Sequence, residues 1–149
     1  MSEAAIQLDL LEAHIDLNAF SFDESALIFS TFLQQLATEM CEKGQFSSKF
    51  LRWTTETLGL RLTPGKIPAV SELRQTRAKT WELYHAEPDC PKKHFLRAVI
   101  CSLYDKDTDA TTELEAPEMI ELFFFVLSDV GTGICERFRV FFESQHKQR

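Results

Sequence analysis

The chain has 149 residues and is expected to fold around the segment Pro117-Glu-Met-Ile-Glu-Leu-Phe-Phe-Phe-Val-Leu-Ser-Asp-Val130. Proline suits the first turn of a helix, because the N–H that it lacks would have no partner there. Gly131 follows at the place where a left-handed C-terminal cap is expected. Six apolar residues recur at helical spacing and form one stripe: Met119, Leu122, Phe123, Val126, Leu127 and Val130.

Three further apolar residues, Ile120, Phe124 and Phe125, fall outside that stripe. A helix that is apolar nearly all round is usually buried on most sides, which predicts a central core helix. A second interpretation stays open, in which Phe124 or Phe125 lines a groove for a partner or an apolar ligand. The stretch is shorter than the roughly 20 apolar residues that cross a bilayer, so we expect no membrane span.

Helix signals precede this stretch along the first half of the chain. Ala4 to Phe20 fits either a helix or a short strand, and its good helix formers favour the helix. Ser21 and Glu24 match a capping box, and an apolar face then runs as far as Gly44. A shorter helix is expected from Ser47 or Ser48 to Gly59, where glycine closes it, and 59–68 reads as a loop.

The second half continues the helical pattern. A helix is predicted from Ala69 to Glu87, with Arg77 inside its apolar stripe, and the next begins at Asp89-Cys90-Pro91. A last helix is predicted from Ile134 to Gln145. The fold class is therefore all-α: one domain over residues 1–149, frayed at both ends, forming an irregular bundle of about six or seven helices around Pro117 to Val130.

Charge is spread unevenly along the chain, whose net charge is −7. Residues 1–42 carry eight acidic and no basic side chains, residues 43–97 have a net charge of +6, and residues 98–149 have −5. The negative total disfavours direct nucleic-acid binding. Two interpretations of the acidic segment 1–42 stay open: it packs against the basic segment 43–97, or it faces a cationic partner. We expect that packing explains only part of the asymmetry.

The four cysteines, Cys41, Cys90, Cys101 and Cys135, are widely spaced and include no C-x-x-C pair. The N-terminus has no basic segment followed by an apolar run, so no secretion signal is expected. Free thiols in a reducing cytoplasm are the expectation, because small secreted folds usually carry denser disulfide frameworks.

One segment has acidic residues at alternate positions: Asp105-Lys106-Asp107-Thr108-Asp109. Its alternating acids after Leu103-Tyr104 resemble the opening of a calcium-binding EF-hand loop, and the resemblance implies Asp105, Asp107 and Asp109 as calcium ligands. The sequence departs from that pattern where the loop requires glycine, which is Ala110 here, and where it requires a bidentate Glu, which is Ala116. A solvated acidic connection from Tyr104 to Ala116 is the alternative.

His85, Cys90, His94 and Cys101 are the one His/Cys group close in sequence. Cys90, His94 and Cys101 are expected on one helix face, away from the apolar one, but Cys101 lies two turns beyond His94. That spacing does not favour a tetrahedral zinc site. The chain also lacks the common catalytic and phosphate-binding motifs, and no pair of carboxylates has a spacing that marks an acid and a base.

These observations predict a small acidic protein of the cytoplasm that acts by protein–protein interaction, as an adaptor, inhibitor or immunity-type regulator, rather than an enzyme. A calcium-responsive helical module is the first alternative, and a small enzyme or carrier of apolar ligands is the second. The expected partner is a protein with a basic surface, since a single-sign acidic face attracts one. The candidate contact residues are Asp9, Glu12, Asp16, Arg77, Phe124 and Phe125.

Overall fold

A computed structural model describes residues 2–105 and 115–147 of the chain. Within these residues it contains seven α-helices, one short 3-10 helix and no strand, which confirms the all-α prediction. The α-helices are α1 (Glu3–Glu12), α2 (Phe22–Glu42), α3 (Ser48–Leu62), α4 (Val70–Ala86), α5 (Cys90–Ser102), α6 (Ala116–Val130) and α7 (Ile134–Lys147). The 3-10 helix η1 (Leu17–Ala19) joins α1 to α2.

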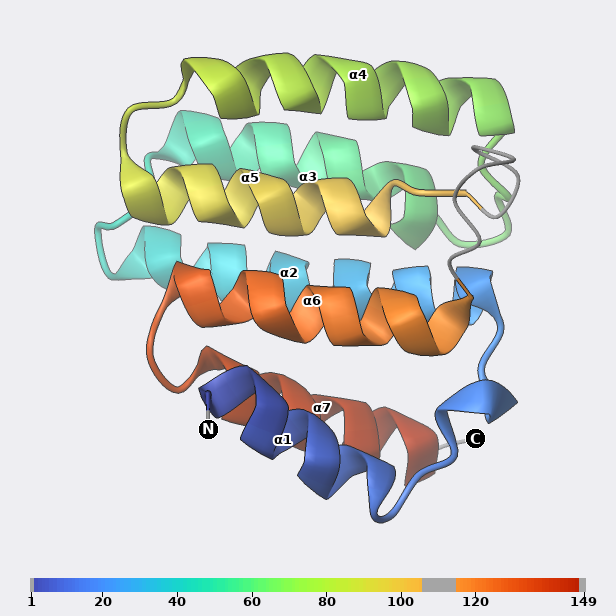
Figure 1. The fold of residues 1–149 in the computed structure, drawn as a ribbon. Coiled ribbons are helices and arrows are strands. Elements are labelled where there is room, and N and C mark those ends of the chain that lie inside the picture. The colour runs from blue at the N-terminus through green and yellow to red at the C-terminus, as the bar shows by residue number, and fades with distance from the viewer. Residues whose placement is uncertain (1, 106–114, 148–149) are drawn as a thin grey trace.

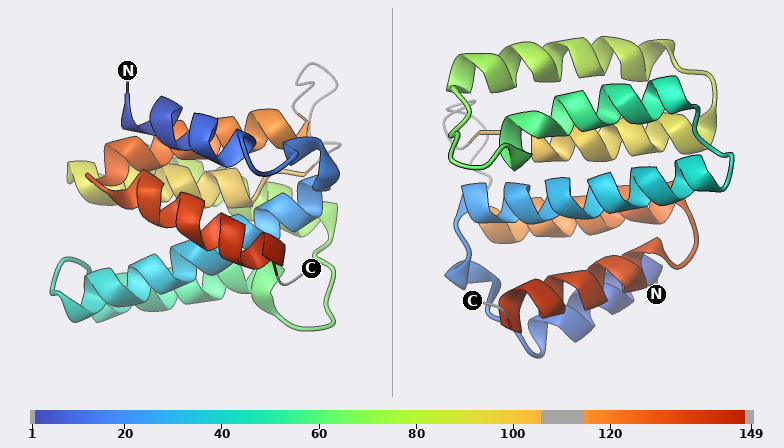
Figure 2. Two further views of the ribbon diagram at one scale, coloured as in Figure 1. Left: turned by 90° about the horizontal axis from the view of Figure 1, so that it is seen from below. Right: turned by 180° about the vertical axis from the view of Figure 1, so that it is seen from behind.

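The helices form two layers (Figure 1). One layer holds α4, α5, α6 and α1 in that order, and the other holds α3, α2 and α7, as the view from behind shows (Figure 2). Helix α6 packs against α1, α2, α5, α7 and η1, so it is the central helix of the bundle. Since α5 and α6 lie side by side and run in opposite directions, the start of α5 lies beside the end of α6 (Figure 1).

Aromatic rings join the two layers at the centre of the core. Phe123 of α6 stacks on Phe29 of α2, with ring centroids 4.1 Å apart. Phe138 of α7 meets the edges of Phe123 and Phe124 at 4.8 and 5.1 Å. All four rings are buried. Tilted and edge contacts of this kind add to the hydrophobic gain from burying the rings. The phenylalanines that recur at helical spacing in α2, α6 and α7 therefore form one core shared by the three helices.

The capping box at the start of α2 forms as predicted. The Ser21 hydroxyl accepts from the Glu24 N–H at 3.0 Å, and the Glu24 carboxylate accepts from the Ser21 N–H at 3.2 Å. The same logic places Ser47 as the cap of α3 and Asp89 as the cap of α5. These caps fix the helix starts because they satisfy N–H groups that no earlier turn of helix can reach.

Two helix ends differ from the sequence prediction. Helix α3 does not stop at Gly59 but continues to Leu62, because the buried Leu58 and Arg61 anchor its last turn and offset the cost of a helical glycine, about 1 kcal/mol. Helix α6 ends without a left-handed cap at Gly131, whose φ of 174° is extended backbone. The left-handed residue of that turn is Gly133, with φ 83°, one position before α7.

The N-terminal segment is helical only in its first part. Helix α1 ends at Glu12, and the predicted continuation to Phe20 is replaced by a connection and by η1. Ile15, Leu17 and Phe20 are buried along this path. The chain buries all three by bending around the end of the bundle. A straight helix could not bury them, because the three residues do not share one helix face.

Candidate interaction surface

The outer sides of α1 and α6 carry acidic residues on one layer of the bundle. The two helices contain six acidic residues and no Lys or Arg. On α6 the exposed positions, Glu118, Glu121, Phe125 and Asp129, follow one another at helical spacing on the side opposite the core. The central helix therefore has an apolar inner side and an acidic outer side.

Helix α1 and the turn after it extend this acidic surface. Asp9, Glu12 and Asp16 are exposed. Glu12 and Asp16 line a hollow of about 490 Å³ that also reaches Pro117 at the start of α6. Asp16 caps η1, since its carboxylate accepts from the Asn18 N–H at 3.0 Å. We call the combined set the acidic face: Asp9, Glu12, Asp16, Glu118, Glu121 and Asp129.

The acidic face has no cationic partner within the part of the chain that the structure describes. Every salt bridge found there joins residues outside α1, η1 and α6. The acids of α2 differ: Asp23 pairs with Arg61, and Glu39 pairs with Lys43 and Arg137. Two acids of α2, Asp23 and Glu39, therefore have cationic partners within the fold, whereas the acids of the acidic face are exposed to solvent.

Exposed apolar side chains accompany the acidic face. Phe125 on α6 is 42% exposed, and Ile6 and Leu10 on α1 are 41% and 43% exposed. Phe124, the other candidate for a groove, is fully buried against Phe138, so the structure corrects that expectation. The reason is rotational: α6 packs against α7 on the side where Phe124 points, and one residue further on the side chain points outward.

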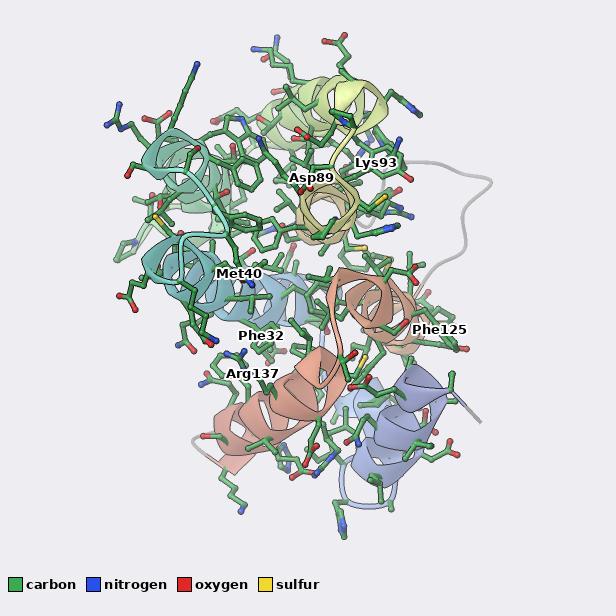
Figure 3. All side chains as sticks on the ribbon, turned by 90° about the vertical axis from the view of Figure 1, so that its left-hand side faces the viewer. Phe32, Met40, Asp89, Lys93, Phe125 and Arg137 are labelled. Atoms are coloured by element: carbon green, nitrogen blue, oxygen red, sulfur yellow. The ribbon has the colours of Figure 1, made fainter. Side chains whose placement is uncertain are left out.

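A basic surface lies beside the acidic one on the same layer. Helices α4 and α5 carry six Lys or Arg and two Glu. Lys93 lies over the Tyr84 ring at 4.7 Å and the Arg97 guanidinium over the Trp81 ring at 4.9 Å. We call these four residues the basic strip. Figure 3 shows Lys93 and Phe125 pointing out of the same side of the molecule, one above the other.

Arg77, which the sequence analysis names as a candidate contact residue, is buried in a hydrogen-bond network and does not lie at the surface. Its guanidinium donates to the Leu103 carbonyl at 3.2 Å and pairs with Asp105 at 3.5 Å, above the Tyr104 ring at 4.9 Å. Its carboxylate partner is therefore Asp105, and the nearby Trp81 and Tyr84 rings lie under Arg97 and Lys93. Being buried, Arg77 does not contribute to an exposed contact surface.

Arg61, which the sequence prediction missed, completes that network. It donates from Nε to the Ser102 carbonyl at 3.0 Å, from Nη2 to the Tyr104 carbonyl at 2.6 Å, and from Nη1 to Asp23 at 2.8 Å. The end of a helix leaves carbonyl groups without intrahelical partners, and here two arginines supply the donors for α5 and the residues after it. The available signal was an arginine among Leu58, Leu60 and Leu62, within the predicted loop.

The predicted calcium ligands divide between described and undescribed residues. Asp105 is buried and its carboxylate pairs with Arg74 at 3.6 Å as well as with Arg77. Two guanidinium groups beside this carboxylate oppose a second cation there. Asp107 and Asp109 lie outside the described residues, and within 2–105 and 115–147 no three His, Cys, Asp or Glu side chains are placed to hold a metal. The calcium site stays a prediction.

The cysteines of α5 do not share one face as expected. Cys90 is exposed, whereas Cys101 is buried, and burial raises the pKa of the Cys101 thiol to about 11 although Arg97 opposes the shift. Burial, aided by the charges of Glu3 and Asp129, raises the pKa of Cys135 to about 12. Both thiols stay protonated at neutral pH, and the thiolate is the form that binds metals.

One end of the bundle contains a cleft of about 450 Å³ (Figure 3). Met40, Phe46 and Ile134 are among its apolar lining residues, and Glu39 and Arg137 are among the charged ones. Hydrogen bonds from Lys43 and Arg137 hold the pKa of the Glu39 carboxyl below its ordinary value of 4.5. Glu39 of α2 pairs with Arg137 of α7. The charges in the cleft therefore join two helices, and we assign the cleft no binding role.

Comparison of the chain with known protein families, curated proteins and solved structures finds no match. None of the helices in the described ranges is long and apolar enough to cross a membrane.

Proposed function

We propose that this protein acts by protein–protein interaction, presenting the acidic face to a partner with a basic surface. Its cellular role is that of a small cytoplasmic adaptor, inhibitor or immunity-type regulator. The observation that carries the proposal is that the acids of α1 and α6, and Asp16 between them, belong to no salt bridge in the described chain, whereas Asp23 and Glu39 of the neighbouring α2 do.

Electrostatics supports a basic partner for this face. Like charges along one face repel one another, and a cationic surface relieves that repulsion while the single-sign field speeds the encounter. Phe125, Ile6 and Leu10 lie on the same two helices and supply apolar surface for a partner to bury. Interfaces commonly combine an aromatic anchor with a charged rim.

The first test uses a defined probe: a synthetic amphipathic helical peptide of Lys and Leu, titrated into the full chain and followed by NMR of backbone amides at about 50 mM salt. We expect the largest shifts on α1, η1 and α6. The same peptide with Glu in place of Lys serves as the control and should leave these amides unchanged. Shifts spread evenly over the molecule, or no binding to the monomeric chain, would contradict the proposal.

A charge-matched pair of variants sharpens this test. Asp9→Asn, Glu12→Gln and Asp16→Asn together should weaken peptide binding about tenfold and slow association more than they speed dissociation. The matched control neutralises three exposed acids of the other layer: Glu42→Gln, Glu56→Gln and Glu136→Gln. If the control weakens binding equally, net charge rather than the acidic face is responsible.

Salt provides an independent measurement on the wild-type chain. The Debye length falls from about 14 Å to about 4 Å between 50 and 500 mM salt, so the association rate with the basic peptide should decrease steeply over that range. Equal binding at both salt concentrations would show that the acids do not contribute and would overturn the electrostatic part of the proposal.

A further inference from the structure

We infer that a second copy of this chain covers the acidic face, in a two-fold symmetric dimer in which α5 of each copy lies over α6 of the other. The inference rests on the proposed function, because it names one basic partner for that face. The observation behind it is that the acidic face and the basic strip lie side by side on one layer, whose helix order is α4, α5, α6, α1 (Figures 1 and 3).

Net charge differs in sign between the two halves of this layer. Helices α4 and α5 hold six Lys or Arg with two Glu, while α6 and α1 hold six acidic and no basic residues. Arg77 is buried, and Arg74 and Lys92 pair with Asp105 and Glu87, so the contact uses Lys93 and Arg97. Lys93 and Arg97 belong to none of the salt bridges in the described residues, and the same holds for Glu121 and Asp129. Each half therefore offers charges that the fold leaves without an oppositely charged partner.

Symmetry then selects one arrangement of two copies. A two-fold axis parallel to the helices and between α5 and α6 places the basic half of each copy over the acidic half of the other. An axis in the same plane but across the helices places α5 over α5 and α6 over α6, where like charges repel. Most homodimers are two-fold symmetric, and repulsion in the alternative adds specificity.

The direction of the helices sets the register of the contact. Because α5 and α6 are antiparallel neighbours, the start of α5 lies beside the end of α6 (Figure 1). The two-fold axis keeps positions along the helices, so Lys93 comes opposite the second copy's Asp129, and Arg97 comes opposite the second copy's Phe125. Each of these contacts occurs twice in the dimer, as a two-fold interface requires.

The chemistry of these side chains suits such a contact. The Arg97 guanidinium lies over Trp81, 4.9 Å from its centroid, and a planar guanidinium has a second side on which another ring can stack. Phe125 is 42% exposed and half-buried Leu122 lies one turn before it. Arginine and aromatic residues are the types enriched at protein interfaces, and here they are flanked by opposite charges.

The experiment measures the mass of the full chain by sedimentation at about 100 µM, well above a dissociation constant of a few micromolar. At 50 mM salt we expect twice the 17.2 kDa of one chain, and at 500 mM a shift toward the monomer. A monomer at 50 mM overturns the inference. If the Lys/Leu peptide still binds the acidic face of that monomer, the proposed function stands; if neither association occurs, both fall.

Charge reversal tests the predicted pair directly. Lys93→Asp alone and Asp129→Lys alone should each weaken dimerisation at least about tenfold, because each change puts like charges together twice. An equimolar mixture of the two variants should recover the dimer, since both contacts become attractive between unlike copies. Lys49→Asp on α3 is the matched control and should leave the dimer intact. A dimer that ignores both reversals, or a mixture that stays monomeric, overturns the inference.

Discussion

The arginine side chains at the end of α5 are buried and paired, whereas the carboxylates of the acidic face are exposed and belong to no salt bridge in the described chain. At the end of α5, the buried guanidinium groups of Arg61 and Arg77 donate to backbone carbonyls and pair with Asp23 and Asp105. On the acidic face, the carboxylates of α1 and α6 are exposed and the described chain offers them no cation. Both regions are rich in charge, but only in the first do the charges hold helices together.

This difference separates structural charges from charges available for binding. A buried ionic group costs several kcal/mol when its partner is removed, so its contacts inside the fold account for it. An exposed acid without a partner contributes little to stability, and a row of them on one side is slightly unfavourable. The acidic face is therefore the region whose composition folding does not explain, and mutations can test each half of this contrast.

The largest effect is expected where a new charge enters the inner side of α6. Phe123→Asp should prevent folding, because it removes a fully buried ring and leaves an unpaired carboxylate in the core. Phe125→Asp, two residues further along the same helix, should fold normally because that side chain is 42% exposed. Circular dichroism melting compares the two. A wild-type-like melt of Phe123→Asp would remove Phe123 from the core.

The arginine network should show the next largest effect. Arg61→Met should cost about 2–4 kcal/mol in the free energy of unfolding, since the Ser102 and Tyr104 carbonyls lose their donor. Arg77→Met should also destabilise the fold. Arg52→Met, an exposed arginine of α3, is the matched control and should change stability by less than about 0.5 kcal/mol. Denaturant titration measures all three, and equal stabilities would mean that the network is not structural.

Glu39 lies between the two extremes, because it is a surface acid with internal partners. Glu39→Gln should lower the melting temperature slightly at pH 7, by removing its pairing with Lys43 and Arg137. The folded-state pKa of Glu39 lies below 4.5, so its stabilisation is present above pH 4.5 and is lost as the pH falls through the folded-state value. Melts from pH 7 downward should therefore converge for wild type and variant. A difference that persists at low pH would mean that the ion pairs are not its cause.

The smallest effect on stability is expected from the acidic face itself. Asp9→Asn, Glu12→Gln and Asp16→Asn together should leave the free energy of unfolding within about 0.5 kcal/mol of wild type, while association is weakened. Asparagine at position 16 keeps an oxygen that can cap η1. A large loss of stability in this variant would place these acids among the structural charges and would abolish the contrast between the two regions.

Local signals in the sequence were sufficient for most of the fold. The capping box at Ser21, the caps at Ser47 and Asp89, and the apolar periodicity of the central helix each involve residues within a few positions of one another. Such signals report on a helix before it packs, so the all-α class, the helix starts and the central position of 117–130 could be predicted. Arg77 was also identifiable, because a charge within an apolar stripe needs a partner.

Which side of each helix is covered depends on contacts between helices that are distant in the sequence. Phe124 is buried and Phe125 is exposed because α7 packs on one side of α6, and no local rule distinguishes the two positions. Arg61 is structural because the end of α5, more than forty residues away, needs its donors. The acidic face and the basic strip adjoin because α5 and α6 are neighbours in one layer. Sequence fixes the charge of a segment, whereas packing decides which charges remain exposed and what lies beside them.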